Sequence, residues 1–435
     1  MSATYKINRS SAVTFFFYRI SRAGFFLILT TFSSLSFAQL DAAVQINKVL
    51  SQLNPVNRAA MVDVFSKQQS EMLQQIKSLQ VRLDEIRSNP AVNEEAKDAA
   101  IAAKEDNVVT AKKSFVVKQA TRQILEGTSP SLPPADLAQI LPEINESISV
   151  AANPMLPICG DTVSYRGTSL QIGWKNVIDQ FLSTYGNSIG AIGRIEVETE
   201  VPVPGTVNTI KRRDLVGTGF AISANEVVTA GHVAHLFWDR EKGALRRTVT
   251  GIFFNTGAEH DFNCLSANKN ANIVHLKSVS LMEYSPNLIP KSSPLDYAVI
   301  QFDPKEASIP SYLTLAAQEE IPKNSFVVIV GYPDKDGRVD QILWKSAMEI
   351  PVLNGMYPVS GIKRIAPGLL LQKCDNASVS HLPHDATTLN RSSGAPIIDI
   401  ATGKVVGIQV AGYRQLDASS VYCNLGLKSS VAKLK

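Results

Sequence analysis

The feature that most constrains the fold is a set of three short segments, each next to a predicted β-strand in the C-terminal half of the chain. The first ends at His232, the second holds Asp296 before an apolar run, and the third presents Ser393 before another. Only a fold that gathers distant strand ends at one place can bring these residues together. The segments are Val227–His232, Leu295–Ile300 and Ser392–Pro396.

The three residue types have complementary chemistry. A serine hydroxyl is a weak nucleophile at neutral pH, so it needs an adjacent base to take its proton. Histidine is suited to this because its pKa lies near neutrality, and a carboxylate on its other ring nitrogen holds the reactive tautomer. We therefore predict a catalytic triad in which Ser393 is the nucleophile, His232 the base and Asp296 the orienting carboxylate.

Strand patterns surround each member of this predicted triad. Short runs of apolar residues are bounded by glycine, serine and asparagine, which is typical of a β-rich domain. Each candidate lies at a strand end or in the turn beside it. The predicted strands are Gly217–Ile222, Val227–Ala230, Tyr297–Phe302, Pro396–Asp399 and Thr402–Ile408.

Four motifs extend the pattern: Gly-Thr-Gly-Phe from Gly217, Thr-Ala-Gly-His from Thr229, Ser-Ser-Gly-Ala-Pro from Ser392 and Val-Val-Gly-Ile from Val405. With these motifs, the chain from about Ile189 onward resembles the trypsin/chymotrypsin-like serine peptidases, in particular the bacterial branch related to glutamyl endopeptidases. The resemblance implies an all-β fold of two perpendicular six-stranded barrels with the active site between them. It also implies a serine endopeptidase that forms an acyl-enzyme with protein or peptide substrates and uses no metal or other cofactor.

The resemblance assigns the oxyanion hole to the backbone N–H groups of Ser393 and Arg391. The family normally has glycine at the position of Arg391, and a Cβ there favours a flipped, inactive peptide. Loss of one oxyanion donor costs about 3 kcal/mol of transition-state stabilisation. We therefore expect Arg391 to lower the constitutive activity without changing the fold.

The resemblance also implies a pocket for the substrate residue that precedes the cleaved bond. Thr387 stands where a preference for basic residues requires an aspartate, and Gln409 stands where glutamyl endopeptidases place a histidine. We therefore expect a preference for an uncharged or small residue. The predicted lining is Thr387, Thr388, Gln409, Val410, Ala411 and Gly412.

Two other functions are compatible with these residues. In the first, the chain is a pseudo-peptidase that binds peptides or proteins because Arg391 has spoiled its oxyanion hole. In the second, the same triad hydrolyses esters. The intact set of triad residues favours an active peptidase over the binding scaffold.

Other polar residues carry weaker signals. His381, His384 and Asp385 have the residue types of a metal site, but Pro383 interrupts them, and we predict a solvated loop. Lys211–Arg213 is predicted to be a solvated hairpin tip, or a site of proteolytic nicking. The other histidines are predicted to be structural: His235 in a surface turn, and His260 and His275 without evident partners.

The N-terminal segment has the pattern of a secretory signal. Basic residues precede the uncharged run Ala23–Phe37, which is short for a membrane span, and small residues at Ser36 and Ala38 suit a signal peptidase. We predict cleavage after Ala38, export to the bacterial periplasm or medium, and no membrane segment afterwards. A net charge of +4 over 435 residues, without a basic stripe, argues against a nucleic-acid partner.

Export makes the four cysteines candidates for two disulfides, for which three pairings exist. Cys374 and Cys423 flank the nucleophile segment, so their pairing would brace the substrate pocket. Cys159 would then pair with Cys264. None of the four has the Cys-x-x-Cys spacing of a zinc or redox site.

Residues 39–128 are predicted to be helical. Apolar residues repeat at alternating steps of three and four from Val62 to Ile86, with Gln69 in one core position, and Pro90 ends the pattern. An antiparallel hairpin and a short coiled coil that self-associates or docks a partner both fit. About three heptads is marginal for an isolated coiled coil, which favours the hairpin.

The predicted organisation has four parts. They are a signal peptide at residues 1–38, the helical region at 39–128, a linker with short helices at 129–185 and the peptidase domain at 186–435. The helical region is either a pro-segment that is later removed or a permanent targeting or assembly module, and the sequence does not choose between them.

Overall fold

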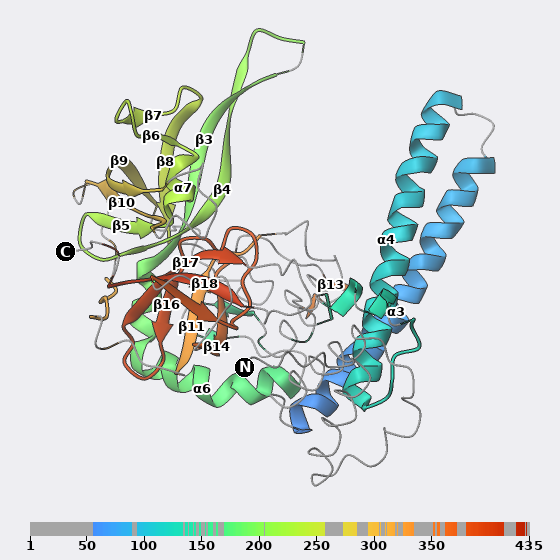
Figure 1. The fold of residues 1–435 in the computed structure, drawn as a ribbon. Coiled ribbons are helices and arrows are strands. Elements are labelled where there is room, and N and C mark those ends of the chain that lie inside the picture. Colours follow the sequence, from blue (N-terminus) through green and yellow to red (C-terminus); the bar gives the residue numbers. More distant parts are fainter. Residues whose placement is uncertain are drawn as a thin grey trace, which may run out of the picture.

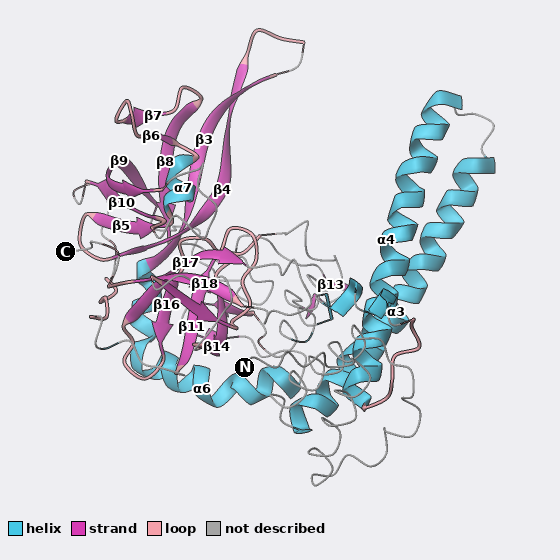
Figure 2. Ribbon diagram, in the orientation of Figure 1, coloured by secondary structure: helices cyan, strands magenta, loops and turns pink. Residues whose placement is uncertain are grey.

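The structure is a computed structural model that describes residues 55–88, 94–256, 273–284, 295–334, 351–356, 362–371, 380–412 and 423–432, with short gaps inside several of these ranges. Two β-structures lie together, and a long pair of helices lies to one side of them (Figure 1). Strands dominate the C-terminal half and helices the N-terminal part (Figure 2). The predicted class, an all-β peptidase fold preceded by an α-helical region, is confirmed.

Helices occupy the first part of the described chain, and strands make up most of the rest. The helices are α3 (Pro55–Ser88), α4 (Glu94–Glu126), α6 (Ser169–Tyr185), the 3-10 helix η2 (Gly186–Ala191) and α7 (Gly231–His235). The strands are β1 (Leu156–Cys159), β2 (Thr162–Val163), β3 (Ile192–Pro202), β4 (Thr209–Ala221), β5 (Glu226–Thr229), β6 (Trp238–Asp239), β7 (Ala244–Leu245), β8 (Val249–Asn255), β9 (Ile273–Glu283), β10 (Tyr297–Phe302), β11 (Phe326–Gly331), β12 (Pro351–Val352), β13 (Gly355–Met356), β14 (Arg364–Leu369), β15 (His381–His384), β16 (Pro396–Asp399), β17 (Val405–Gly412) and β18 (Asn424–Lys428).

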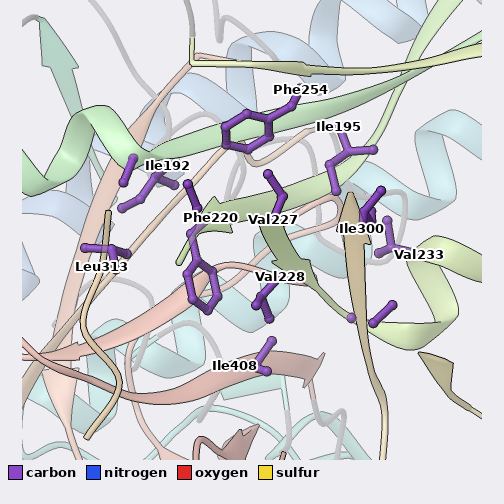
Figure 3. Close-up of a cluster of buried hydrophobic side chains, with 14 of the residues drawn as sticks. Ile192, Ile195, Phe220, Val227, Val228, Val233, Phe254, Ile300, Leu313 and Ile408 are labelled. Atoms are coloured by element: carbon purple, nitrogen blue, oxygen red, sulfur yellow. The ribbon is translucent and has the colours of Figure 1, made fainter. Parts of the chain in front are cut away.

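The first barrel is a closed ring of antiparallel strands in the order β10–β5–β4–β3–β8–β9. Its interior is filled by buried apolar side chains from around the ring, and Figure 3 shows Ile195, Phe220 and Ile300 among them. β5 and β10 are neighbours, with Ala298 opposite Thr229. The ring therefore places the end of β5 beside the start of β10, where two of the predicted triad residues lie.

The second β-structure is a sheet in the order β15–β18–β17–β16–β11–β14–β1–β2. An isolated antiparallel bridge joins Leu370, just after β14, to His384 in β15. Beside it, the Leu371 N–H donates to the Pro383 carbonyl at 2.9 Å. The strands from β15 to β14 thus close into a second ring of six, and β1 and β2 continue the sheet beyond β14.

A single hydrophobic core crosses from the first barrel to the second. Val228 on β5 and Ile408 on β17 belong to the same buried cluster and lie close together in Figure 3. Leu313, between β10 and β11, is buried in this cluster, and its N–H donates to the Ala221 carbonyl at 2.9 Å. Because protein interiors are close-packed, this shared core holds the two barrels in one relative position.

Part of the segment predicted to be a linker belongs to the second sheet. β1 pairs with β14, with Leu156 opposite Ile365, and β2 pairs with β1. One of the short helices predicted in this segment is α6, whose Tyr185 hydroxyl donates to the Ala401 carbonyl at 3.0 Å. The predicted linker of residues 129–185 therefore includes strands, which are too short to show an alternation in the sequence.

α3 and α4 pack against each other as an antiparallel hairpin (Figure 1). The predicted heptad positions of α3 are buried or half-buried, and Phe65 and Met72 are fully buried. Phe65 shares a cluster with Ile124 of α4 and with Ile144, which follows α4 in the chain. The predicted helical region is confirmed, and the structure shows it as a hairpin. Its self-association remains a prediction.

The strands β3 and β4 form a hairpin that extends beyond the rest of the first barrel (Figure 1). Lys211–Arg213 was predicted to be its tip but lies within β4, whereas residues 203–208 connect the strands. Lys211 pairs with Glu198 at 2.9 Å, and Arg213 lies 3.8 Å from Glu196. The prediction of a solvated tip is wrong because acidic residues across the ladder neutralise the basic run and let the strand continue.

Several predictions concern residues that the structure describes only in part. Cys423, buried just before β18, is disulfide-bonded. Cys264, Cys374 and the predicted signal peptide lie outside the described residues, so the predicted pairing remains a prediction. Within the described ranges, no helix has the length and apolar character needed to cross a membrane.

Phe65→Ala is expected to destabilise the helical hairpin by about 3–5 kcal/mol, because it leaves a cavity where a fully buried ring packed. Leu73→Ala on the same helix is the control, since Leu73 is 45% exposed and its removal should cost less than about 1 kcal/mol. Urea unfolding followed by far-ultraviolet circular dichroism measures both. Equal effects of the two substitutions would contradict the packing of α3 on α4.

Candidate active site

His232 and Asp296 are joined by two hydrogen bonds. β5 ends at Thr229 and α7 begins at Gly231, so His232 lies in the first turn of α7, and Asp296 directly precedes β10. The Asp296 Oδ2 atom is 2.7 Å from His232 Nδ1, and Oδ1 accepts the His232 backbone N–H at 2.8 Å. The carboxylate thus orients both the ring and the backbone, and it leaves Nε2 as the ring nitrogen that can accept a proton.

The residue before His232 has to be glycine. A Cβ on Gly231 would lie 2.5 Å from the Glu283 carbonyl oxygen and 3.1 Å from Asp296 Oδ1. A side chain here would displace the carboxylate from the imidazole. The Thr-Ala-Gly-His motif therefore has a direct physical reason, which is the close approach of β9 and Asp296 to the start of α7.

Ser393 lies in the nucleophile loop, residues 390–394, which directly precedes β16 of the second barrel. The first barrel holds this loop, because the Thr218 N–H on β4 donates to the Ser393 carbonyl at 2.9 Å. Gly394 has φ +88, and a Cβ there would lie 2.2 Å from Thr229 Oγ1 and 2.9 Å from the Ala230 nitrogen. The loop is thus pressed against the segment that leads to His232. The structure thus pairs His232 with Asp296 and places the loop that carries Ser393 beside the segment that leads to His232.

Most backbone groups of the nucleophile loop are already paired. By contrast, the Ser393 N–H has no acceptor in the described part of the chain, and the only acceptor there for the Arg391 N–H is Oδ1 of the exposed Asn390, at 3.2 Å. These are the two N–H groups predicted to form the oxyanion hole. The paired groups are the Asp334 N–H with the Asn390 carbonyl (2.8 Å), the Ser392 N–H with the Leu389 carbonyl (3.1 Å), the Gly394 N–H with the Gln409 carbonyl (2.7 Å) and the Ala395 N–H with the Ser392 carbonyl (3.0 Å).

The bond from Asp334 holds the peptide that carries the Arg391 N–H. This peptide is trans, so its C=O and N–H point in opposite directions. With the Asn390 carbonyl directed at Asp334, the Arg391 N–H points away from Asp334. Reversal of this peptide, which we expected a Cβ at Arg391 to favour, would break the bond to Asp334.

Arg391 has φ +68 and is the only non-glycine residue with positive φ in the described chain. This left-handed conformation costs a residue with a Cβ about 1–2 kcal/mol. Two contacts with β4 offset it: the Thr218 hydroxyl donates to the Arg391 carbonyl at 3.0 Å, and Arg391 Nη1 lies 3.5 Å from the Val216 carbonyl. The arginine that departs from the family pattern is therefore held in a glycine-like conformation.

Two residues around His232, Tyr284 and Arg246, were not found from the sequence. The Tyr284 ring centroid is 6.2 Å from that of His232 and 5.3 Å from that of His235, and Arg246 Nη2 lies 3.1 Å from the His235 ring nitrogens. Burial and the Asp296 carboxylate raise the pKa of Tyr284, and burial and Arg246 lower the pKa of His235. Both groups are therefore neutral at pH 7. His235 is half-buried in α7, which differs from the predicted surface turn.

Some of the predicted pocket residues belong to a buried polar network between the end of β17 and the segment before the nucleophile loop. Gln409 Nε2 donates to the Ala411 carbonyl at 3.0 Å and to Thr388 Oγ1 at 3.3 Å. Its Oε1 is 2.7 Å from His384 Nε2, so that ring nitrogen carries the proton. Thr387 and Val410 are also buried. The network is uncharged, and Gly412, the last predicted lining residue, ends β17.

The prediction that His381, His384 and Asp385 lie in a solvated loop is wrong. The two histidines are in β15, which pairs with β18, and both are buried. Burial lowers the pKa of His384 to about 4 and also lowers the pKa of His381, so both are neutral and suit a strand interior. Asp385 accepts the Leu369 N–H at 2.6 Å. No group of metal-ligating side chains occurs in the part of the chain that the structure describes.

Part of the chain matches a known protein family. Residues 217–408 match the model of the trypsin-like peptidase domain. This part of the chain is a trypsin-like peptidase domain. A solved structure that matches the chain is a thermostable serine protease from an extremophilic microorganism, with 13% identity, a TM-score of 0.33, and coverage of 56% of this chain and 92% of that one. No curated protein sequence matches significantly.

Arg391→Gly is expected to stabilise the peptidase domain by about 1 kcal/mol, because glycine adopts the left-handed conformation without steric cost. Arg391→Ala is the matched control, since it removes the guanidinium but keeps the Cβ. Urea unfolding midpoints compare the three proteins. A loss of stability in the glycine variant equal to that in the alanine variant would show that the arginine side-chain contacts outweigh the backbone strain.

Acid is expected to destabilise the peptidase domain through His384. The unfolded histidine takes up a proton near pH 6.5, whereas the folded one stays neutral until about pH 4. The stability is therefore fully present above pH 6.5 and falls by roughly 3 kcal/mol between pH 6.5 and pH 4. In His384→Gln, which keeps a donor for Gln409, this part of the pH dependence should disappear. Urea unfolding across this pH range measures it, and an unchanged pH dependence would contradict the assignment.

Proposed function

We propose that the peptidase domain is a serine endopeptidase whose nucleophile, base and orienting carboxylate are Ser393, His232 and Asp296. The observation that carries this proposal is the two-point hydrogen bonding of Asp296 to His232, next to a loop in which the Arg391 and Ser393 N–H groups have no backbone acceptor within the described part of the chain. An aspartate that only capped α7 would bond the backbone N–H and would have no reason to bond the histidine ring as well.

In the proposed reaction, the Ser393 Oγ atom attacks the carbonyl carbon of the substrate while His232 Nε2 takes the hydroxyl proton. The carbonyl oxygen becomes an oxyanion that the two N–H groups stabilise. The C–N bond then breaks, and the imidazolium gives its proton to the leaving amine. Water attacks the resulting acyl-enzyme with the same base, which releases the acid and restores Ser393. Asp296 stabilises the imidazolium in both steps.

The buried network around Gln409 supports a preference for an uncharged substrate residue. Thr388, Gln409 and His384 contribute donors and acceptors but no formal charge, because the His384 ring stays neutral. A charged substrate side chain buried against such groups would lack a counter-charge, which is costly in a site shielded from water. We expect cleavage after small or uncharged polar residues rather than after lysine, arginine or glutamate.

We also propose that the protein acts outside the cytoplasm, which the predicted signal peptide supports. The disulfide at Cys423 supports an oxidising compartment, because such bonds persist mainly in exported proteins. We retain both roles for the hairpin, a removable pro-segment or a module for assembly. The mature active enzyme would lack residues 39–128 in the first case and keep them in the second.

Mass spectrometry of a peptide library treated with the wild-type protein and with Ser393→Ala tests the proposal. We expect defined cleavages after uncharged residues with the wild type, and at least a thousandfold slower cleavage with the variant. Cleavage dominated by arginine, lysine or glutamate would contradict the proposed preference. No cleavage, combined with peptide binding by the wild type, would favour the pseudo-peptidase scaffold, and ester turnover alone would favour an esterase.

A further inference from the structure

Thr218 connects the first barrel to the nucleophile loop at two points. It lies in β4, within the Gly-Thr-Gly-Phe motif, and its side chain is completely buried. Its N–H donates to the Ser393 carbonyl at 2.9 Å, and its hydroxyl donates to the Arg391 carbonyl at 3.0 Å. One residue of the first barrel therefore holds carbonyl groups on both sides of Ser392 in the second.

The direction of the hydroxyl hydrogen bonds is unambiguous. The Tyr332 backbone N–H, at 3.0 Å from Thr218 Oγ1, can only donate. The Arg391 carbonyl can only accept, so the single hydroxyl proton of Thr218 has to be directed at it. Thr218 and Tyr332 are buried, so an alternative position of the loop would leave the Thr218 hydroxyl proton without a partner in a site withdrawn from water.

The same hydroxyl also ties the nucleophile loop to the segment that follows β11. Tyr332 begins this segment, and Asp334, two residues later, donates its N–H to the Asn390 carbonyl at 2.8 Å. β11 can come this close because a Cβ on Gly331 would already lie 3.2 Å from Thr218 Oγ1. The Thr218 hydroxyl therefore contacts two segments that fix the direction of the Arg391 N–H. One is the segment that begins at Tyr332 and whose Asp334 bonds the Asn390 carbonyl, and the other is Arg391 itself.

A positioning contact is needed here because Arg391 is strained. A residue with a Cβ prefers to leave the left-handed region, and rotation about its backbone bonds would move both its carbonyl and its N–H. A glycine at this position would need no such restraint. The Thr218 hydroxyl bonds the Arg391 carbonyl directly and so opposes this rotation.

We propose that Thr218 is the positioning residue of the oxyanion hole, acting through the Arg391 carbonyl from the opposite barrel. This inference rests on the proposed serine endopeptidase activity, and it assigns to Thr218 no contact with substrate. The bond from Thr218 explains how an arginine can occupy a position at which the oxyanion hole requires the left-handed backbone that glycine adopts. It also predicts that catalysis depends on the hydroxyl of a residue on the first barrel.

The test compares Thr218→Val, which keeps the size and the backbone N–H, with Thr218→Ser, which keeps the hydroxyl. Ser429→Ala is the matched control, because the Ser429 hydroxyl also makes a buried bond to a carbonyl, that of Ala316 at 3.1 Å. Steady-state kinetics on a cleaved peptide and hydrogen exchange of the peptide spanning residues 389–395 are measured on each full-length protein. Inhibition by a peptide aldehyde, whose adduct places an oxygen in the oxyanion hole, is measured in parallel.

For Thr218→Val we expect kcat to fall about 10- to 100-fold with KM within about twofold, and the aldehyde to bind correspondingly more weakly. Thr218→Ser should stay within about threefold of the wild type. Exchange in residues 389–395 should become at least about tenfold faster in Thr218→Val only, whereas Ser429→Ala should leave kcat and this exchange unchanged.

Two results would overturn the inference. Unchanged loop exchange in Thr218→Val would do so whatever the kinetics, and so would an equal loss of kcat in the valine and serine variants. Faster loop exchange in Thr218→Val together with an inactive wild type would instead contradict the proposed endopeptidase activity, while still supporting the role of Thr218 in positioning the loop.

Discussion

The contact between β4 and the nucleophile loop is the constraint on which the candidate site depends. His232 and Asp296 belong to the first barrel, where the ladder between β5 and β10 already brings their backbones together. Ser393 belongs to the second barrel, and the Thr218 N–H holds its carbonyl against the first. The shared core beneath this contact keeps the barrels in one relative position, so the placement of Ser393 relative to His232 depends on packing as much as on the residues themselves.

The backbone of the loop explains how an arginine can occupy a position that favours glycine. Most peptides from Asn390 to Gly394 have a group bonded to a neighbouring segment, whereas the Arg391 and Ser393 N–H groups have no backbone acceptor in the part of the chain that the structure describes. Preorganised donors of this kind stabilise an oxyanion because they need no rearrangement during the reaction. The same bonds hold Arg391 in the left-handed backbone conformation, which is unfavourable for a residue with a Cβ.

Much of this site could be predicted from the sequence because its motifs combine local glycine requirements with strand patterns. Gly231 and Gly394 are required by close approaches, and the strands beside them are short, mostly apolar runs that are buried along their length. Predictions failed where a polar segment of the sequence forms a strand because of the residues that surround it in the fold. The strand His381–His384 contains two histidines that burial keeps neutral, and the basic residues of β4 extend a strand because carboxylates lie across the ladder. Tyr284 and Thr218 gave no recognisable functional signal, because their roles depend on contacts between segments distant in sequence.

The central claim is that Ser393 is activated by His232 and Asp296. Its most direct test is the reaction of the purified protein with a fluorophosphonate, followed by intact-mass measurement, with Ser393→Ala and Asp296→Asn alongside. The account predicts one adduct on the wild type, none on the serine variant, and labelling slowed by about 10⁴-fold in the asparagine variant, by analogy with the effect of this substitution in a serine protease triad. Labelling of Ser393→Ala at the wild-type rate, or no labelling of the wild type, would contradict the account.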